Sequence, residues 1–306
     1  MKTRTKKLKP KTKKDIIFFV VMMIVPLTQF AIFYVAVNFN SILLAFEEYN
    51  ADTAQYFFAG FSNFEKAFAE FFGESTVLRT AFVNSLLLSL VTVVVGITLG
   101  LLFSYSIYKK CFGHKFFKVM LFMPSILSSI VVALMFTYFV ERAIPDVVFT
   151  LFGKKIEGLL SNPDSTIPVL IFYSIWTSFG TSMLLYVGAM NNIDESIIEA
   201  GKLDDTNGLT EFIHIVFPSI YPTFIVFLTT TLVGIFTNQM NLYSFYGGSA
   251  EYRLYTVGYY LYRNTKLATL AEYPVLSAKG LMLTIIAVPL VLSIKSLLEK
   301  IGPSED

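Results

Sequence analysis

The chain contains 306 residues, of which 55% are hydrophobic and 15% are charged, and its mean hydropathy is +0.63. Soluble domains average about 45–50% apolar and about 25% charged residues, so this composition excludes an ordinary soluble domain and indicates a membrane protein. The formal net charge of +2 is distributed unevenly, because eight of the 24 Lys and Arg residues lie within positions 1–14 and the remainder of the chain is net negative.

The basic tail, residues 1–15, runs directly into a hydrophobic stretch. A basic flank of this kind orients a first membrane span with the tail in the cytoplasm, which explains the charge better than a nucleic-acid patch does. A secretory signal has an apolar part of only about 7–15 residues, and the stretch 16–37 is longer than that. We therefore expect an uncleaved first helix and no nucleic-acid partner.

Six hydrophobic runs are each long enough to cross a hydrocarbon core of about 30 Å at a rise of about 1.5 Å per residue. In chain order they are 16–37, 80–108, 119–140, 165–193, 215–250 and 273–294. Only the last contains a charged residue, Lys279. The sequence thus predicts an all-α, polytopic membrane protein, with six transmembrane helices in a domain over 16–298 and a C-terminal tail over 299–306.

The distribution of charge between the runs predicts their direction. Segment 38–77 is mostly acidic and is expected outside, whereas the loop after the second run holds Lys109, Lys110 and Lys115 and is expected inside. With six spans both termini are then cytoplasmic. The loop 194–211 is also cytoplasmic by this count although its charged residues are mostly acidic. The orientation rule therefore does not account for its composition.

A short cytoplasmic helix is predicted within segment 191–218, between spans four and five. Asp194 can cap it, and Ser196 with Glu199 has the spacing of a capping box. The helix would cover 195–204 and place Ile197, Ala200 and Asp204 on one face, bordered by Ile198. The small pair Ala200-Gly201 would allow this face to approach a partner closely.

The rest of segment 191–218 is predicted as a turn over 205–208, in which Asn207 and Gly208 can adopt positive φ, followed by a second helix over 209–216. Pro218 would then redirect the chain into span five. A solvated loop with a Glu199–Lys202 pair is the plainer alternative.

The spacing of Glu199-Ala200, Asp204, Phe212, Ile215 and Pro218 resembles the cytoplasmic loop of permease subunits in binding-protein-dependent ABC importers. Those proteins carry Glu-Ala-Ala, then Asp-Gly, then Phe, Ile and Leu-Pro. This chain departs from the pattern at Gly201, Asp205 and Phe217. The resemblance implies that the loop inserts a short helix into an ATP-binding subunit. It implies coupling to the ATPase through Glu199, Ala200, Gly201, Asp204, Asp205, Ile215 and Pro218.

Weaker similarities lie at 58–64, 116–124, 247–262 and 273–280, in the order found in the carbohydrate branch of these permeases, the maltose, glycerol-phosphate and oligosaccharide type. This resemblance implies a bacterial cytoplasmic membrane protein that imports a sugar or oligosaccharide. The implied partners are an ATP-binding cassette subunit, a second permease in a heterodimer, an extracytoplasmic solute-binding protein and membrane lipid. ATP would be bound by the partner, so we expect no cofactor on this chain.

Polar and aromatic side chains within the runs are candidates for the solute path, because such groups are costly at bilayer depth unless they face a cavity or a partner helix. The candidates are Trp176, Asn238, Gln239, Asn241, Tyr243 and Lys279. Hydrogen bonds between helices are the alternative role for each. Lys279 could line the path, form an ion pair or extend to the headgroups.

Other function classes fit less well. An ion-coupled secondary transporter needs a buried Asp or Glu within a span, and the six runs contain none. A channel would leave segment 191–218 without a role. No nucleophile with an adjacent base, His/Cys metal cluster or phosphate-binding loop is recognisable, so we expect neither an enzyme nor a metal site. The single Cys111 reads as a filler residue.

Overall fold

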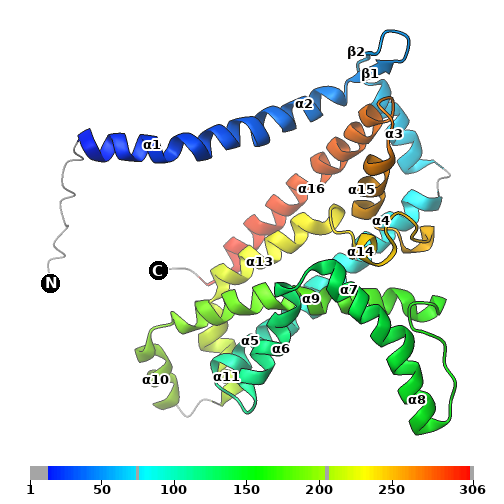
Figure 1. The fold of residues 1–306 in the computed structure, drawn as a ribbon. Helices are drawn as coiled ribbons and strands as arrows, with labels where there is room; N and C mark the ends of the chain where they lie inside the picture. Colours follow the sequence, from blue (N-terminus) through cyan, green and yellow to red (C-terminus); the bar gives the residue numbers. More distant parts are fainter. Residues whose placement is uncertain (1–12, 74–75, 204–206, 304–306) are drawn as a thin grey trace. The chain divides into compact units, whose positions relative to one another are not determined.

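A computed structural model describes residues 13–73, 76–203 and 207–303 (Figure 1). The chain divides into two compact units. The first contains residues up to 67 together with 268–281, and the second contains 68–267 together with residues from 282 onward. By length and composition four helices can cross a membrane, or up to six if two bent helix pairs each count as one span, among the described residues.

The first unit begins with a continuous helical rod made of α1 (Lys13–Gln29), the π-helical segment η1 (Phe30–Ala36) and α2 (Val37–Leu44). Its apolar span, Ile17–Leu44, is longer than the predicted run 16–37. The prediction ended too early because Asn38 and Ser41 are polar, yet their side chains donate to the carbonyls of Tyr34 and Val37 one turn back, which satisfies them inside the helix.

A β-hairpin follows this rod, and the sequence did not predict it. Strands β1 (Glu47–Asn50) and β2 (Gln55–Phe58) pair antiparallel with Tyr49 opposite Tyr56, and these two rings meet edge to face at 5.2 Å. Asn50 Oδ1 accepts the backbone N–H groups of Asp52 and Thr53, which closes the turn. Helix α3 (Ser62–Phe72) follows, and its residues up to Ala67 belong to the first unit while those from Phe68 belong to the second. The all-α prediction holds apart from this hairpin.

Asn63 ties the hairpin to α3. Its side chain is fully buried, and Nδ2 donates to the carbonyl oxygens of Ala45 at 3.1 Å and of Glu47 at 2.7 Å. We expect Asn63→Asp to lower the free energy of unfolding by about 2 kcal/mol or more, because the substitution removes both donations and buries a carboxylate against two carbonyls. Thermal unfolding of the purified protein measures this. Gln55→Glu makes the same chemical change at an exposed hairpin position and should have little effect.

The second unit contains most of the remaining spans. Helices α4 (Thr76–Val91) and α5 (Thr98–Tyr108), joined by the π-helical η2 (Thr92–Ile97), form one span of 32 residues, and α9 (Pro163–Asn191) forms another. Helix α16 (Tyr273–Ile301) begins in the first unit and ends in the second. These helices agree with the predicted runs 80–108, 165–193 and 273–294, although α16 continues past the predicted end of the transmembrane domain at 298.

The predicted third span is not one straight helix. Helices α6 (His114–Ile126) and α7 (Ser129–Tyr138) are separated by extended backbone at Leu127, and the two halves of the run are bent by 114°. The helix restarts where Val132 N donates to Ser128 O. It continues through η3 (Phe139–Ala143) and α8 (Ile144–Phe152), beyond the predicted end of the run at residue 140.

The predicted fifth span is also broken. Helices α11 (Gly208–Glu211), η4 (Phe212–Val216) and α12 (Phe217–Ser219) meet α13 (Tyr221–Val233) and η5 (Gly234–Phe236) at a bend of 75°. Helical backbone stops after η5 instead of reaching residue 250. The chain then forms α14 (Leu242–Tyr246), η6 (Tyr252–Leu254) and α15 (Val257–Leu267). Met240 and Asn241 have positive φ, at 51° and 53°, which is incompatible with a continuous helix.

The segment before α15 is anchored to α4. Asn84 Nδ2 donates to the carbonyl oxygens of Arg253 and Tyr255, and Ser85 Oγ accepts the N–H of Val257 at 2.9 Å. Around these bonds lies the largest buried cluster of the second unit, which includes Leu78, Leu88, Leu170, Phe236, Met240, Leu242, Leu254, Tyr255, Tyr259 and Leu283. A short interrupted segment is thereby held rigidly against three long helices.

Candidate functional site

Helix α10 (Glu195–Leu203) is the predicted short helix, and it follows the end of α9 (Figure 1). Asp194 is its N-cap, because Oδ1 accepts the backbone N–H of Ser196 at 3.0 Å and the hydroxyl of Ser196 at 2.8 Å. The backbone hydrogen bond, with a smaller contribution from the hydroxyl, lowers the pKa of the Asp194 carboxyl. Of the two capping arrangements left open by the sequence, the structure thus selects Asp194.

The packed face of α10 contains Ile198 and Gly201. Ile198 is buried, in one cluster with Met190, Val216 and Ile220, and Gly201 is also buried. Ile197 and Ala200 lie on the exposed side, as a face that meets a partner requires, whereas Gly201, which was predicted to let that face approach a partner closely, is buried. The reason is that Gly201 follows Ile198 by three residues, and the bulky apolar Ile198 turns its side of the helix toward the cluster.

The outward face of α10 contains Ser196, Glu199, Ala200 and Leu203, all of which are exposed. Leu203 is 87% exposed, and Ile197 beside this face is 48% exposed. We call these five residues the α10 surface. It combines one carboxylate with apolar side chains that no described residue covers. Asp204 and Asp205, predicted to belong to the same site, lie outside the described residues.

Asn207 begins the second helix of the segment. Its φ is −73°, and its Oδ1 accepts the backbone N–H groups of Leu209 at 3.1 Å and Thr210 at 2.9 Å. Asn207 is therefore the N-cap of α11, and Gly208 is its first helical residue. The prediction that these two residues adopt positive φ is wrong, because a capping asparagine has extended backbone.

The last two predicted residues of the site lie on the helices that lead into α13. Ile215 is half-buried and packs on the cluster that contains Ile198. Pro218 does not redirect the chain, because it occupies the first turn of α12, where the missing N–H is tolerated. The bend comes instead at Ile220, whose φ of −100° departs from helical backbone.

An ion pair that the sequence did not reveal braces this segment. Lys109 Nζ, at the end of α5, lies 3.0 and 2.8 Å from the two carboxylate oxygens of Glu211 in α11. The Glu211 side chain is 5% exposed and that of Lys109 is 31% exposed. Nearby, the Tyr105 hydroxyl donates to the carbonyl of Gly208 at 2.8 Å. The cation and carboxylate are 102 residues apart in the chain, a distance at which a single sequence carries no pairing signal.

We expect Glu211→Lys to lower the free energy of unfolding by about 3–5 kcal/mol, because it replaces a buried pair by two like charges. Lys109→Glu combined with Glu211→Lys restores opposite charges and should recover part of the loss. Thermal unfolding of the native protein, of the single variants Lys109→Glu and Glu211→Lys, and of the double variant gives the coupling energy between the two side chains. If the loss of stability in the double variant equals the sum of the losses in the two single variants, the two side chains do not interact.

The candidates for the solute path separate into groups. Asn238, Gln239 and Asn241 lie in the break after η5, where Asn238 Oδ1 accepts the N–H of Met240 at 2.8 Å. Tyr243 follows in α14, with its ring edge to face with that of Tyr262 at 5.0 Å. These four residues thus belong to a non-helical segment and a short helix, not to the wall of a continuous span.

Trp176 and Lys279 have other surroundings. Trp176, on α9, is half-buried in an aromatic group with Phe136 and Tyr173, and Tyr173 meets Phe245 of α14 at 4.7 Å. Lys279, in the first unit, is only 4% exposed, unlike a lysine that extends to the headgroups. No group of three or more His, Cys, Asp or Glu side chains suited to a metal ion is found in the part of the chain that the structure describes.

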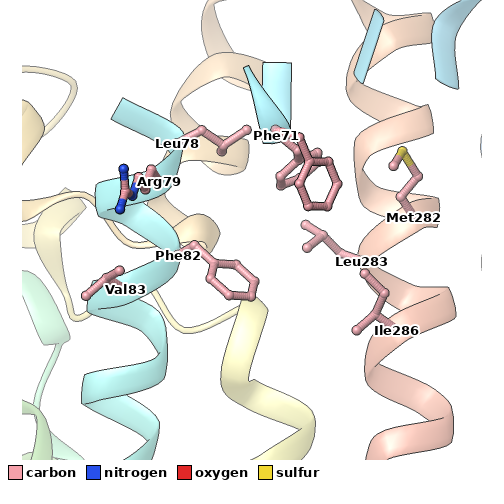
Figure 2. A pocket seen from close by; sticks show the side chains of 9 residues that line it. Phe71, Leu78, Arg79, Phe82, Val83, Met282, Leu283 and Ile286 are labelled. Carbon is pink, nitrogen blue, oxygen red and sulfur yellow. The ribbon is translucent and has the colours of Figure 1, made fainter. Parts of the chain in front are cut away.

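A pocket of about 300 Å³ lies between α3, α4 and α16 in the second unit. Figure 2 shows Phe71, Phe82 and Leu283 converging on it from these three helices. Arg79 is the only polar side chain of its lining. A sugar site needs several hydrogen-bonding groups, so this apolar pocket is a poor candidate for the solute path.

Comparison with known proteins gives a consistent result. The sequence model of a family described as "Binding-protein-dependent transport system inner membrane component" matches residues 93–305. The chain is 23% identical to the probable ABC transporter permease protein YurN of Bacillus subtilis, covering 89% of this chain and 92% of that protein. It is 24% identical to the multiple sugar-binding transport system permease protein MsmF of Streptococcus mutans, covering 78% and 81%.

A solved structure shares the fold. It is the crystal structure of a bacterial ABC transporter that imports the acidic polysaccharide alginate. One of its chains superposes with a TM-score of 0.78 at 20% identity, covering 95% of this chain and 98% of that one. At this identity the similarity concerns the fold alone.

Proposed function

Since the chain belongs to the family of binding-protein-dependent transport system inner membrane components, we propose that it forms half of the path by which an ABC importer admits a sugar or oligosaccharide. The family match over residues 93–305 carries this proposal. The sugar class rests on MsmF, whose name gives a sugar transport system, and on the polysaccharide importer that has the same fold.

The α10 surface supports a docking role for this segment. An exposed leucine beside an exposed carboxylate is typical of a surface that becomes covered in a complex, with the apolar group supplying contact area and the charge supplying orientation. The partly buried Lys109–Glu211 pair holds α11 against α5, and Ile198 of α10 packs in one cluster with Met190 and Val216, so a movement of α10 would be passed to the spans. The occupant that we propose is an ATP-binding cassette subunit, which would bind and hydrolyse ATP while this chain performs no chemistry.

The remaining partners follow from the same assignment. The family requires a solute-binding protein, which would deliver the sugar from outside. A second, distinct permease would complete the path as a heterodimer. Closure of the ATPase subunits would drive the permease pair between inward-open and outward-open states, and each ligand shifts these states only by its difference in affinity for them.

Affinity purification of the full chain from its native membrane tests the assignment. A companion permease and an ATPase should co-purify, and cross-linking before extraction should capture the binding protein. Purification of a complex that lacks any ATPase would contradict the proposed function. Uptake of labelled sugars by the reconstituted complex would then identify the solute.

The proposed orientation places both termini, the α5–α6 loop and α10 in the cytoplasm of a bacterial cell. Cys111 reports on it, because it is exposed in that loop and is the only cysteine of the sequence. We expect a membrane-impermeant maleimide to label Cys111 in inside-out vesicles and not in right-side-out vesicles. Cys111→Ser should abolish the signal. Labelling from the outside would reverse the topology and with it the docking role of α10.

A further inference from the structure

The pocket between α3, α4 and α16 is too apolar for a sugar, but its lining suits a hydrocarbon chain. Eight of its nine lining residues are apolar, and the ninth is Arg79. Its volume of about 300 Å³ holds about ten groups of the size of a water molecule or a methylene, at about 30 Å³ each. Apolar cavities exclude water and bind apolar ligands instead. The interior of the pocket therefore favours a ligand made of CH₂ groups.

The pocket opens on the outer surface of the second unit. Three of its lining side chains are strongly exposed, namely Phe72 at 71%, Val83 at 55% and Ile286 at 52%. Val83 and Ile286 belong to the apolar spans formed by α4 with α5 and by α16, so the medium at this rim is the hydrocarbon of the bilayer. Leu283 is only 4% exposed and forms an inner wall, toward which Phe82 points from α4 (Figure 2).

Arg79 adds a positive charge at one end of this rim. It is exposed, and it is the third residue of the apolar span that begins at Val77, about 3 Å into the span at about 1.5 Å per residue. Val83 lies one turn deeper. The Arg79 side chain forms no ion pair or hydrogen bond with any residue that the structure describes. Orientation does not account for this cation, because Lys and Arg gather at cytoplasmic ends and this end of the span is expected outside.

The arrangement of charge and apolar surface matches the two parts of a phospholipid. The phosphate of such a lipid lies near the level at which a span ends, and its acyl chains extend from there into the hydrocarbon. A guanidinium donates charge-assisted hydrogen bonds to phosphate oxygens, often two at once. Arg79 can therefore hold the phosphate at the rim, while the apolar walls take up part of a chain. Charge complementarity thus selects a lipid over an apolar protein segment as the occupant.

We propose that this pocket binds one phospholipid of the surrounding bilayer, with its phosphate on Arg79 and part of one acyl chain between Phe82 and Leu283. The lipid fills the gap between α4 and α16 and so joins two spans that lie far apart in the sequence. The site follows from the membrane location of the chain and does not rest on the proposed function. Only the choice of the outer leaflet rests on the proposed orientation.

Native mass spectrometry of the full chain, purified with its partners and titrated with phosphatidylglycerol, tests the phosphate contact. Diacylglycerol with the same acyl chains lacks the phosphate and should bind at least about tenfold more weakly. Arg79→Gln should weaken binding of phosphatidylglycerol about tenfold, as expected for the loss of one charge-assisted hydrogen bond, and leave binding of diacylglycerol unchanged. Arg142→Gln removes an exposed arginine outside the pocket and is the matched control. Equal binding of the two lipids, or equal effects of the two substitutions, would overturn the proposal.

A second pair of variants tests the pocket itself. Ile286→Trp adds a large side chain at the rim, whereas Ile285→Trp makes the same change at a residue that is 62% exposed and does not line the pocket. Phosphatidylglycerol binding should fall about tenfold or more in the first variant and stay at the native level in the second. Equal binding by the two variants would show that the lipid does not enter the pocket.

A cryo-EM map of the complex in nanodiscs that contain phosphatidylglycerol identifies the occupant directly. We expect elongated density in the pocket and headgroup density within hydrogen-bond distance of the Arg79 guanidinium. Side chains of a companion permease in the pocket, or a pocket without density, would overturn the proposal. Absence of an ATPase from the purified complex would contradict the proposed function instead, and it would leave the lipid measurements valid.

Discussion

Glu199→Lys is expected to abolish solute uptake, with a loss of at least about 100-fold, and to leave the amount of protein in the membrane unchanged. Glu199 lies on the outward side of α10, away from the buried Ile198, so the substitution disturbs no packing within the chain. At the proposed interface it places a cation where a carboxylate is expected, and reversal of a buried interfacial charge costs several kcal/mol. The measurements are uptake into cells or proteoliposomes and membrane content by immunoblot.

Leu203→Asp provides a second test of the same surface, because Leu203 is 87% exposed and its replacement removes no packing within this chain. Both variants should keep the companion permease and lose the ATPase on purification. Glu157→Lys makes the same charge change at an exposed residue outside segment 191–218 and should transport normally. Normal uptake by Glu199→Lys and Leu203→Asp would show that the α10 surface is not the docking site.

Gly258→Ala is expected to have a large effect on folding, with a loss of about 3 kcal/mol in the free energy of unfolding. A Cβ at this position would lie 2.5 Å from the carbonyl carbon and oxygen of Thr237 and 2.8 Å from the carbonyl oxygen of Asn238. These are backbone atoms, which cannot rotate away. The hydroxyl of Thr256 also donates to the Asn238 carbonyl at 2.8 Å, so α15 and the break after η5 would have to separate.

Gly234→Ala is the matched control for this prediction. It lies three residues before Thr237, and an added Cβ there meets nothing within 4 Å. Thermal unfolding and the yield of folded protein should therefore be close to native for Gly234→Ala and strongly reduced for Gly258→Ala. Similar values for the two variants would mean that α15 does not approach the break as closely as the structure shows.

The features that the sequence predicted correctly are local. Hydrophobic runs identify spans because every lipid-facing residue must be apolar, and a helix satisfies its own backbone bonds in lipid. A helix over 195–204 was predicted, and α10 is observed over Glu195–Leu203, because its cap, Asp194, and its apolar Ile198 are neighbours in the chain. The resemblance in segment 191–218 likewise depends on spacing within 28 residues.

The features that it missed depend on distant partners. Hydropathy treats 215–250 as one span, because it does not register the positive φ at Met240 and Asn241. The same holds for the break at Leu127, where every neighbouring residue is apolar or small. The burial of Gly201 was also missed, because it depends on the cluster formed by α9, η4 and α12 and not on α10 alone.

By itself, the sequence determined that this chain lies in a membrane, how many apolar runs it has and where a polar helix interrupts them. Each of these follows from the transfer of side chains between water and hydrocarbon, which is additive along the chain. Only the tertiary structure decided where the runs break, which carboxylate pairs with Lys109 and which side of α10 is buried. Those features depend on hydrogen bonds and contacts between residues far apart in the chain, and no local pattern records such a pairing.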